Sequence, residues 1–386
     1  MSAILDKLLK GQKVEWLPLG EACEIADNLR KPVKSSLRVA GNIPYYGANN
    51  IQDYVEGYTH NGEYVLIAED GSANLENYSI QWATGKFWAN NHVHVVKGKE
   101  NLDSRFLYHF LRFMNFIPYL TGGDRAKLTK AKMVEIPIPI PPLDVQAEIV
   151  RILDAFTAVT AELTAELNMR EKQYQYYRDK LLSFSDVSIE TDSNRQQQTA
   201  LSERIANNVK QNHQIIWKSL GEVCHKIISG KNKDRIDDGK YPIFGSTGVI
   251  GRTNLKVYDK EQLLVARVGA NAGFVHIANG EYDVSDNTLI IQNKEDTSLK
   301  FLYYLLTNMN LNQFAKGAGQ PLITASQLKL LKIPVPPLNE QKRIANVLDK
   351  FEMLTNSITE GLPKEIALRQ QQYEYYREQL LDFPKN

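Results

Sequence analysis

A tandem duplication constrains the fold of this chain more than any other feature of its sequence. Four landmarks recur once each, in the same order: residues 16–23 recur as 217–224, residues 106–111 as 301–306, residues 141–146 as 336–341 and residues 173–178 as 372–377. The spacing between landmarks changes by only a few residues, as expected when surface loops gain or lose residues after a duplication. The repeat is far longer than the roughly 20–50 residues of solenoid repeats. Each copy is therefore predicted to form a globular domain followed by a helix.

The two copies differ most between the landmarks, where residues 31–85 correspond to residues 231–280. The residue patterns predict strands at 63–68, 93–96, 262–266 and 289–291, and helices at 104–115 and 298–312. Each domain is therefore expected to mix strands and helices. A duplicated scaffold with two different interiors suggests one architecture that presents two different recognition surfaces.

A long helix is predicted over residues 144–184. Asp144 can cap its start, and neither proline nor glycine follows before Phe184. Apolar residues recur at alternating steps of four and three, which is the pattern of a coiled-coil seam. The second copy begins at Asn339 and shows the same pattern, but Pro363 is expected to end or kink that helix.

The first helix carries a doubled four-residue unit, because residues 160–163 and 164–167 both read Thr-Ala-Glu-Leu. The unit interrupts the alternation of four and three. Such a four-residue insertion locally unwinds a coiled coil without breaking the helix.

The two long helices are predicted to pair with each other. A helix of about 40 residues is roughly 60 Å long, which is too long to bury against one small domain. An antiparallel pair would place the two domains at opposite ends of a rod with pseudo-twofold symmetry. A parallel pair stays open, because the polar segment 185–214 is long enough to return the chain. The seam, which is also the expected docking surface for partners, includes Phe156, Leu163, Leu167, Tyr174, Tyr177, Phe351, Leu354, Tyr373 and Tyr376.

The predicted fold class is α+β, with two globular mixed α/β domains joined by two long antiparallel coiled-coil helices. The boundaries follow the landmarks: the first domain at 1–143, the central helix at 144–184, a linker at 185–214, the second domain at 215–337 and the distal helix at 338–386. Cys23 and Cys224 fall on equivalent positions and are predicted to be small buried residues.

Local charge points to a candidate nucleic-acid surface. The formal net charge is only +1, so any DNA contact must be local or shared with a partner. Residues 215–260 and 121–132 are rich in lysine and arginine, which suit phosphates, and are accompanied by asparagines and tyrosines, which suit base edges. The candidate DNA-binding residues are Tyr45, Tyr46, Asn49, Asn90, Asn91, Arg125, Lys127, Lys231, Lys233, Arg235, Lys240, Arg252, Arg267, Asn271 and Gln320.

Catalytic and metal-binding motifs are not supported. Residues 42–45 read Asn-Ile-Pro-Tyr, which is similar to the turn with which adenine methyltransferases hold a flipped base, but no glycine-rich cofactor loop precedes it. His92 and His94 lie on one face of a strand without a third ligand nearby, which favours a structural role. The chain also lacks a phosphate-binding loop and a nucleophile elbow. It is therefore predicted to be a reader without chemistry of its own.

A cytoplasmic location without membrane contact is expected. No run approaches the ~20 apolar residues that a membrane helix needs. The first residues lack the basic-then-apolar layout of a secretory signal.

Taken together, the landmarks resemble the specificity (S) subunit of type I restriction–modification enzymes. The resemblance covers essentially the whole chain and rests on residues 16–21, residues 136–146, the doubled Thr-Ala-Glu-Leu, residues 173–184 and their second copies. It implies a bacterial or archaeal protein whose two globular parts are target recognition domains, each reading one half of a split sequence in double-stranded DNA. It also implies that the helices set the gap between the half-sites and dock two modification (methyltransferase) subunits.

The resemblance places the chemistry in other subunits. It implies a non-catalytic chain without cofactor or metal, with S-adenosylmethionine in the modification subunits and ATP and magnesium in the motor/nuclease restriction subunits, whose presence is left open. Two rival functions also stay open. One is a coiled-coil scaffold that bridges protein partners without touching DNA, and the other is an autonomous DNA methyltransferase.

Overall fold

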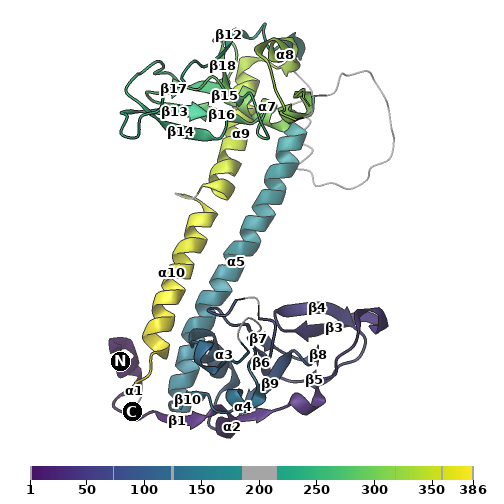
Figure 1. Cartoon of the computed structure of the whole chain (residues 1–386), viewed down its shortest axis with the longest axis vertical. Coiled ribbons are helices and arrows are strands. Elements are labelled where there is room, and N and C mark those ends of the chain that lie inside the picture. The colour runs from purple at the N-terminus through teal and green to yellow at the C-terminus, as the bar shows by residue number, and fades with distance from the viewer. Residues whose placement is uncertain are drawn as a thin grey trace. The chain divides into compact units, whose positions relative to one another are not determined.

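The structure of the chain is a computed structural model that describes residues 2–72, 74–122, 126–184, 215–317, 319–357 and 360–384. The chain forms two compact units, drawn in Figure 1. The first unit comprises Met1–Thr164 and Glu365–Asn386, and the second comprises Ala165–Lys364. The predicted linker, residues 185–214, lies outside the described residues.

The first unit is built on two four-stranded sheets and one strand pair. The first sheet is antiparallel, in the order β2 (Cys23–Ile25), β9 (Val93–Gly98), β6 (Tyr64–Ala68) and β7 (Ile80–Ala83). The second has the order β4 (Asn50–Val55), β3 (Ala40–Gly47), β8 (Lys86–Ala89) and β5 (His60–Asn61), with β8 parallel to β3. The pair joins β1 (Glu15–Pro18) to β10 (Pro137–Ile140).

The second unit repeats this topology, except that β5 has no counterpart among its described strands. Its four-stranded sheet has the order β12 (Cys224–Ser229), β18 (Thr288–Asn293), β15 (Gln262–Ala266) and β16 (Val275–Ala278). A three-stranded sheet follows the order β14 (Gly248–Thr253), β13 (Tyr241–Gly245) and β17 (Asp283–Val284), with β17 parallel to β13. The pair joins β11 (Ile216–Ser219) to β19 (Lys332–Val335). The predicted duplication and the mixed fold class are confirmed.

Each unit places one amphipathic helix beside its four-stranded sheet. These are α3 (Ser104–Phe113) and α7 (Leu299–Asn308), and the side chains of Asp103 and Ser298 cap their N-termini. The shorter helices are α1 (Ala3–Leu9), α2 (Leu19–Ala22), α4 (Lys130–Met133) and α8 (Ala325–Leu330), and short 3-10 helices lie at Asp27–Leu29, Ser35–Leu37, Ile117–Tyr119 and Leu311–Phe314.

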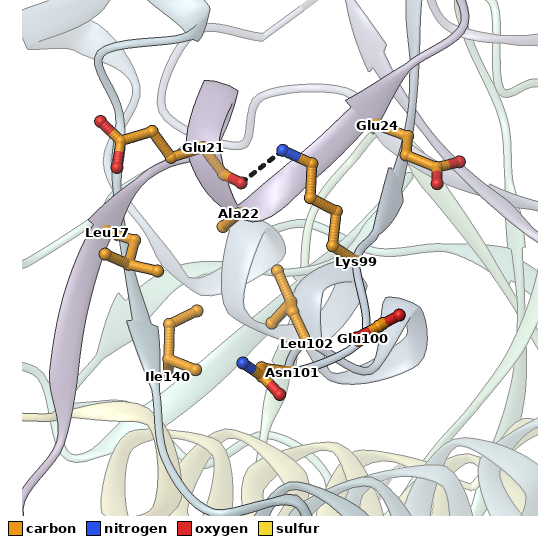
Figure 2. A pocket seen from close by; sticks show the side chains of 9 residues that line it. All are labelled: Leu17, Glu21, Ala22, Glu24, Lys99, Glu100, Asn101, Leu102 and Ile140. Atoms are coloured by element: carbon orange, nitrogen blue, oxygen red, sulfur yellow. Dashed lines mark hydrogen bonds between the residues drawn. The ribbon is translucent and has the colours of Figure 1, made fainter.

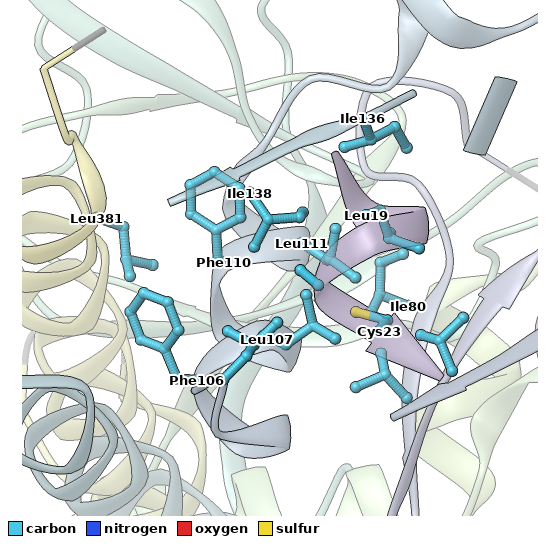
Figure 3. Packing of buried hydrophobic residues seen from close by; sticks show 14 of the residues in the cluster. Leu19, Cys23, Ile80, Phe106, Leu107, Phe110, Leu111, Ile136, Ile138 and Leu381 are labelled. Atoms are coloured by element: carbon cyan, nitrogen blue, oxygen red, sulfur yellow. The ribbon is translucent and has the colours of Figure 1, made fainter. Parts of the chain in front are cut away.

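The core of the first unit joins the two ends of the chain. Figure 3 shows Leu107 and Phe110 of α3, Ile138 of β10 and Leu381 near the C-terminus in one apolar cluster. Cys23 lies in the same cluster and Cys224 in that of the second unit, so both cysteines are buried, as predicted. Burial raises the pKa of each thiol to about 12, which leaves both unreactive at neutral pH.

The first long helix, α5, runs from Leu143 to Leu182 without a break through the doubled unit, as predicted. The second copy is two helices, α9 (Leu338–Asn356) and α10 (Leu362–Leu381). The predicted interruption of this helix is confirmed, because α9 ends at Asn356 and Pro363 lies in the first turn of the next helix, α10, where proline costs no hydrogen bond. The chain turns before it, at Gly361 with φ +81°, where a Cβ would lie 2.5 Å from the carbonyl oxygen of Met353.

The long helices pair antiparallel within each unit (Figure 1). In the first unit, Phe156 of α5 stacks on Tyr376 of α10 with ring centroids 5.1 Å apart, and the earlier Ile149 shares a core with the later Leu380. In the second unit, Tyr177 of α5 stacks on Phe351 of α9 at 5.5 Å, and Tyr174 lies 6.4 Å from the same ring. Leu163, Leu167, Leu354 and Tyr373 are half-buried. None of the helices in the described ranges is long and apolar enough to cross a membrane.

Candidate nucleic-acid interface

Four segments of the first domain meet where β3, β6 and β8 end and β9 begins. They are residues 47–50, 69–72, 90–92 and 126–128, which we call the first loop cluster. The Asn49 amide donates to the carbonyl of Gly71 at 2.7 Å, and the Asn90 N–H donates to the carbonyl of Tyr46. The backbone of Glu69 joins the remaining two segments, because its N–H donates to His92 and its carbonyl accepts from Leu128.

A network of ion pairs and hydrogen bonds joins this cluster to the domain, with the side chains of His94 and Asp27 buried and that of Lys127 42% exposed. His94 is 1% exposed, and its ring nitrogens lie 2.7 Å from the Asp27 carboxylate and 2.9 Å from the carbonyl of Leu128. The two contacts tie the ring to the segment before β3 and to the last residue of the 126–128 segment. The Glu69 carboxylate accepts from Arg30 at 2.7 Å and from Lys127 at 3.1 Å. These histidine contacts are structural, as the sequence predicted for His94.

Replacing Asp27 by asparagine is expected to destabilise the chain by about 1–3 kcal/mol at pH 7, because it removes the charged acceptor of the buried His94 ring and of the Val95 N–H. Burial raises the pKa of Asp27, but hydrogen bonds from His94 and from the Val95 N–H outweigh it, so the pKa lies below its usual value. A lowered carboxyl pKa stabilises the fold above the unfolded value near 4, and this contribution is lost as pH falls through the folded pKa. Urea unfolding of Asp27→Asn should therefore depend less on pH between about 5 and 2.

The matched control is Asp53→Asn, whose side chain is 43% exposed and pairs with Arg38 at the surface. That change should cost less than about 1 kcal/mol. An Asp27→Asn variant with the pH dependence and stability of the parent would show that the network does not support the cluster.

The second domain has an equivalent loop cluster on its own strands. It comprises residues 231–232, 245–248, 267–271, 285–287 and 319–323, which we call the second loop cluster. The Ser246 hydroxyl donates to the carbonyl of Asn287 at 3.3 Å, and the Ser285 N–H donates to Phe244. The N–H groups of Lys231 and Asn232 donate to the carbonyl of Val284, which attaches residues 231–232 to the cluster.

Glu69 and Arg267 occupy the same position in the two clusters. Glu69 directly follows β6, and Arg267 directly follows β15, the equivalent inner strand of the second domain. The backbone of Glu69 bonds to His92 and Leu128, and the backbone of Arg267 makes the matching bonds to Asn287 and Ile323. The charge at this position is therefore reversed between the domains. The Arg267 guanidinium makes only long contacts, 3.5 Å from Ser229 Oγ and from the Asp286 carbonyl, and its buried Nε has no partner among the described residues.

The first-domain candidates separate into surface and supporting residues. Asn49, Asn91 and Lys127 lie on the first loop cluster, and Tyr46 is half-buried against Phe87. Tyr45 and Asn90 are buried at 1% and 3% exposure. The Tyr45 hydroxyl accepts from the Val33 N–H at 3.0 Å, and Asn90 Oδ1 accepts from the His92 N–H at 2.8 Å. This corrects the prediction for both, because side chains bound into the loop scaffold are not placed to contact a base. Arg125 lies outside the described residues.

The second-domain candidates fall into two groups. Lys231, Arg267, Asn271 and Gln320 belong to the second loop cluster, and all but Arg267 are exposed. The other group consists of exposed basic residues, namely Lys233, Arg235, Lys240 and Arg252. Lys240 and Arg252 lie at the end of the β13–β14 hairpin opposite its turn. The Arg252 guanidinium donates to the carbonyls of Gly239 at 2.5 Å and Lys240 at 2.8 Å, so it holds the preceding loop.

Sequence reasoning missed several polar residues of the two clusters. His92 Nδ1 lies 2.5 Å from the Asp70 carboxylate on the first cluster, and Ser246 and Asp286 belong to the second. The signal that could have found them is the alignment of the two copies at the ends of β6 and β15. That alignment places Glu69 opposite Arg267 and identifies this edge as the position where the copies diverge.

An open pocket of about 430 Å³ lies elsewhere in the first domain and is unsuited to DNA (Figure 2). It is lined by the acidic residues Glu21, Glu24 and Glu100, and the one lysine, Lys99, donates to the Glu21 carbonyl at 2.7 Å. Lys294 makes the same contact with the carbonyl of Glu222 in the second domain. These lysines therefore close a turn, and the carboxylates would repel phosphate. In the described part of the chain, no group of three or more metal-binding side chains is present.

A family profile and several similar proteins all point to the same protein family. The sequence profile described as "Type I restriction modification DNA specificity domain" matches residues 12–170 and 216–368. A protein of Haemophilus influenzae named as a type I restriction enzyme specificity subunit is 50% identical over 397 residues, covering 98% of both chains. The specificity subunit of the type I restriction enzyme EcoR124I/EcoR124II of Escherichia coli is 34% identical over 421 residues, covering 99% of this chain and 97% of that protein.

The fold agrees with these relatives. A crystal structure of a type I restriction-modification system S subunit from M. genitalium superposes with a TM-score of 0.68 at 15% identity, covering 97% of both chains. The two profile matches fall on the two copies found from the landmarks, and the relatives at 50% and 34% identity span both copies. The resemblance seen in the sequence is therefore confirmed, and the chain belongs to the type I restriction-modification DNA specificity family.

Proposed function

We propose that the chain reads a bipartite DNA sequence for a type I restriction–modification complex. Residues 1–143 and 215–337 act as target recognition domains, each reading one half-site. Residues 144–184 and 338–386 act as spacer helices that set the gap and dock modification subunits, and residues 185–214 link the two halves. The observation that carries this proposal is the pair of loop clusters, which share one scaffold but have opposite charge at the position of Glu69 and Arg267.

The proposed contacts are the surface residues of the two clusters. Asn49, Asn91 and Asn271 offer donors and acceptors for base edges, and Lys127 and Lys231 offer charge for phosphates. Arg267 is the strongest candidate for direct reading, because its guanidinium makes only weak contacts within the chain and can form a bidentate pair with guanine.

The chemistry is proposed to belong to other subunits. Two modification subunits would supply methyl transfer from S-adenosylmethionine, and restriction subunits, where present, would supply ATP- and magnesium-dependent cleavage. The chain would then have no catalytic role and would work on double-stranded DNA in the cytoplasm. The near-neutral charge fits this arrangement, because partner subunits can supply much of the phosphate contact.

Arg267→Ala is expected to weaken methylation of the native site by about 10- to 100-fold in the complex with modification subunits. Specificity should relax at one position of one half-site, because the lost contact reads a base. The measurement is the rate of methylation of duplexes that carry every single-base change in the site. Lys260→Ala is the control, because its exposed side chain lies outside both clusters. A complex without any sequence preference would instead support the scaffold function.

A further inference from the structure

A polar cluster lies where α3 meets α5 and α10 in the first unit. It contains three arginines and one acidic group: Arg105 and Arg112 of α3, Arg377 of α10 and Asp154 of α5. Arg105 Nη2 lies 2.9 Å from the Asp154 carboxylate, and its guanidinium lies over the rings of Trp82 and Tyr108. Asp154 also accepts from Nε2 of His109 at 2.7 Å. We call this group the arginine cluster.

Three buried polar atoms of the arginine cluster have no partner among the described residues. They are His109 Nδ1, the Tyr373 hydroxyl and Arg377 Nε. His109 is 0% exposed, and since its Nε2 donates to Asp154, the neutral ring has an unused acceptor at Nδ1. Burial lowers the pKa of His109 to about 4, so the ring is neutral at pH 7. Most buried polar atoms in folded proteins are hydrogen-bonded, so orphaned atoms call for a bound water, an ion or a partner. The Tyr373 hydroxyl and Arg377 Nε can donate to a carboxylate, whereas the neutral His109 Nδ1 only accepts and does not pair with one.

The second unit contains the same cluster with its charges balanced. The duplication places Tyr303, Tyr304, Asp349 and Tyr174 where the first unit has Tyr108, His109, Asp154 and Tyr373. The Tyr304 hydroxyl lies 2.7 Å from the Asp349 carboxylate and 2.6 Å from that of Glu352, and the Tyr303 hydroxyl donates to Glu352 at 3.2 Å. None of the orphaned atoms found among the described residues belongs to this second cluster.

Glu352 is the group that the first unit lacks. Its equivalent in the first unit is Thr157, whose hydroxyl donates back to the carbonyl of Asp154 at 2.9 Å and so does not enter the cluster. The first cluster therefore holds three guanidinium groups against one carboxylate. The second holds Lys300 and Arg178 against two carboxylates.

We propose that the arginine cluster of the first unit binds a carboxylate side chain, Asp or Glu, of a docked modification subunit. This inference rests on the proposed function, because it requires that partner. The second unit shows that a carboxylate fits this arrangement of helices, where it comes from α9 of the same chain. Arg112 is exposed and the side chain of Asp154 is 37% exposed, so an incoming side chain has access.

A protein carboxylate fits the cluster better than a DNA phosphate. In the second cluster the carboxylates of Asp349 and Glu352 share the Tyr304 hydroxyl, so this arrangement of helices accommodates two carboxylates side by side. The cluster also lies on three helices and not on the loop cluster of its domain. A phosphate ligand is nevertheless a distinct outcome of the experiment below.

The test supplies the missing carboxylate from the chain itself. Thr157→Glu reproduces the residue of the second unit and is expected to weaken binding of one modification subunit to the full chain by about 10- to 100-fold. Binding is measured by calorimetric titration with the purified modification subunit at two salt concentrations. The affinity that remains should depend less on salt than that of the parent, because the charge pair between the chains is lost. The melting temperature of the free variant should equal or exceed that of the parent, which shows that it folds.

Thr157→Gln is the matched control, because it has the size of glutamate without its charge, and its affinity should stay within about threefold of the parent. Equal losses in both variants would show that bulk and not charge opposes docking, which overturns the proposal. Unchanged subunit binding in Thr157→Glu, with weaker binding of a 30-base-pair duplex, would identify phosphate as the ligand and also overturn it. If the unaltered chain bound no modification subunit at all, the proposed function itself would fail.

Discussion

Deletion of residues 164–167, one of the two Thr-Ala-Glu-Leu units, is expected to move methylation to sites whose half-sites lie one to two base pairs closer together. Removing four helical residues shortens α5 by ~6 Å, and adjacent base pairs are about 3.4 Å apart. The boundary between the two units falls within this doubled segment, at Thr164 and Ala165, inside one continuous helix. Methylation of the native site should fall by at least about 100-fold, because both domains can no longer reach their half-sites together.

The control for this deletion is Thr164→Ala, which removes the hydrogen bond from the Thr164 hydroxyl to the Thr160 carbonyl without changing the helix length. The Thr164→Ala variant should methylate sites with the same gap between half-sites as the parent. Methylation mapping of a library of gap lengths separates the two variants. An active deletion variant with an unchanged gap would show that α5 does not set the spacing.

Exchange of residues 215–335 for the same segment of a relative with a different target is expected to change one half-site completely and leave the other unaltered. The segment carries the second loop cluster and its sheets, and its strands pair only with each other in the described residues. The first loop cluster is supported by Asp27, Arg30 and His94, all within its own domain. Each domain should therefore keep its own preference, with methylation of the old second half-site reduced by about 1,000-fold or more.

The reciprocal exchange of residues 12–142 is the matched control and should change the other half-site alone. Both chimaeras retain the helices, so the gap should not change. A chimaera in which both half-sites changed would show that the domains do not read DNA independently.

The scaffold was predictable because its signals are local or repeated. The coiled-coil pattern predicted both ends of α5 to within two residues, because the spacing of apolar residues such as Phe156 and Tyr177 along the sequence defines the face of the helix that packs. The strands and helices near the landmarks were predicted for the same reason. Pro363 marked the interruption of the second helix correctly, and the turn itself also needs Gly361, whose positive φ accommodates the close carbonyl of Met353.

The candidate site was only partly predictable, because it depends on contacts between distant segments. Tyr45 and Asn49 lie close in the sequence and have similar polar character. Yet the Tyr45 hydroxyl bonds to Val33, and Asn49 lies on the surface against Gly71. The sheet register, and not composition, decides which side chain faces outward. Glu69 and Arg267 carry opposite charges at equivalent positions, and this equivalence becomes apparent only when the ends of β6 and β15 are aligned.

Single-molecule methylation sequencing of the host genome tests the central claim most directly, namely that two different domains of one chain each read their own half of a split sequence. The account predicts one modified motif made of two unlike specific halves separated by a fixed number of unspecified base pairs, and its loss when the gene for this chain is deleted. A continuous motif, two identical halves, or a split motif that persists after the deletion would contradict it.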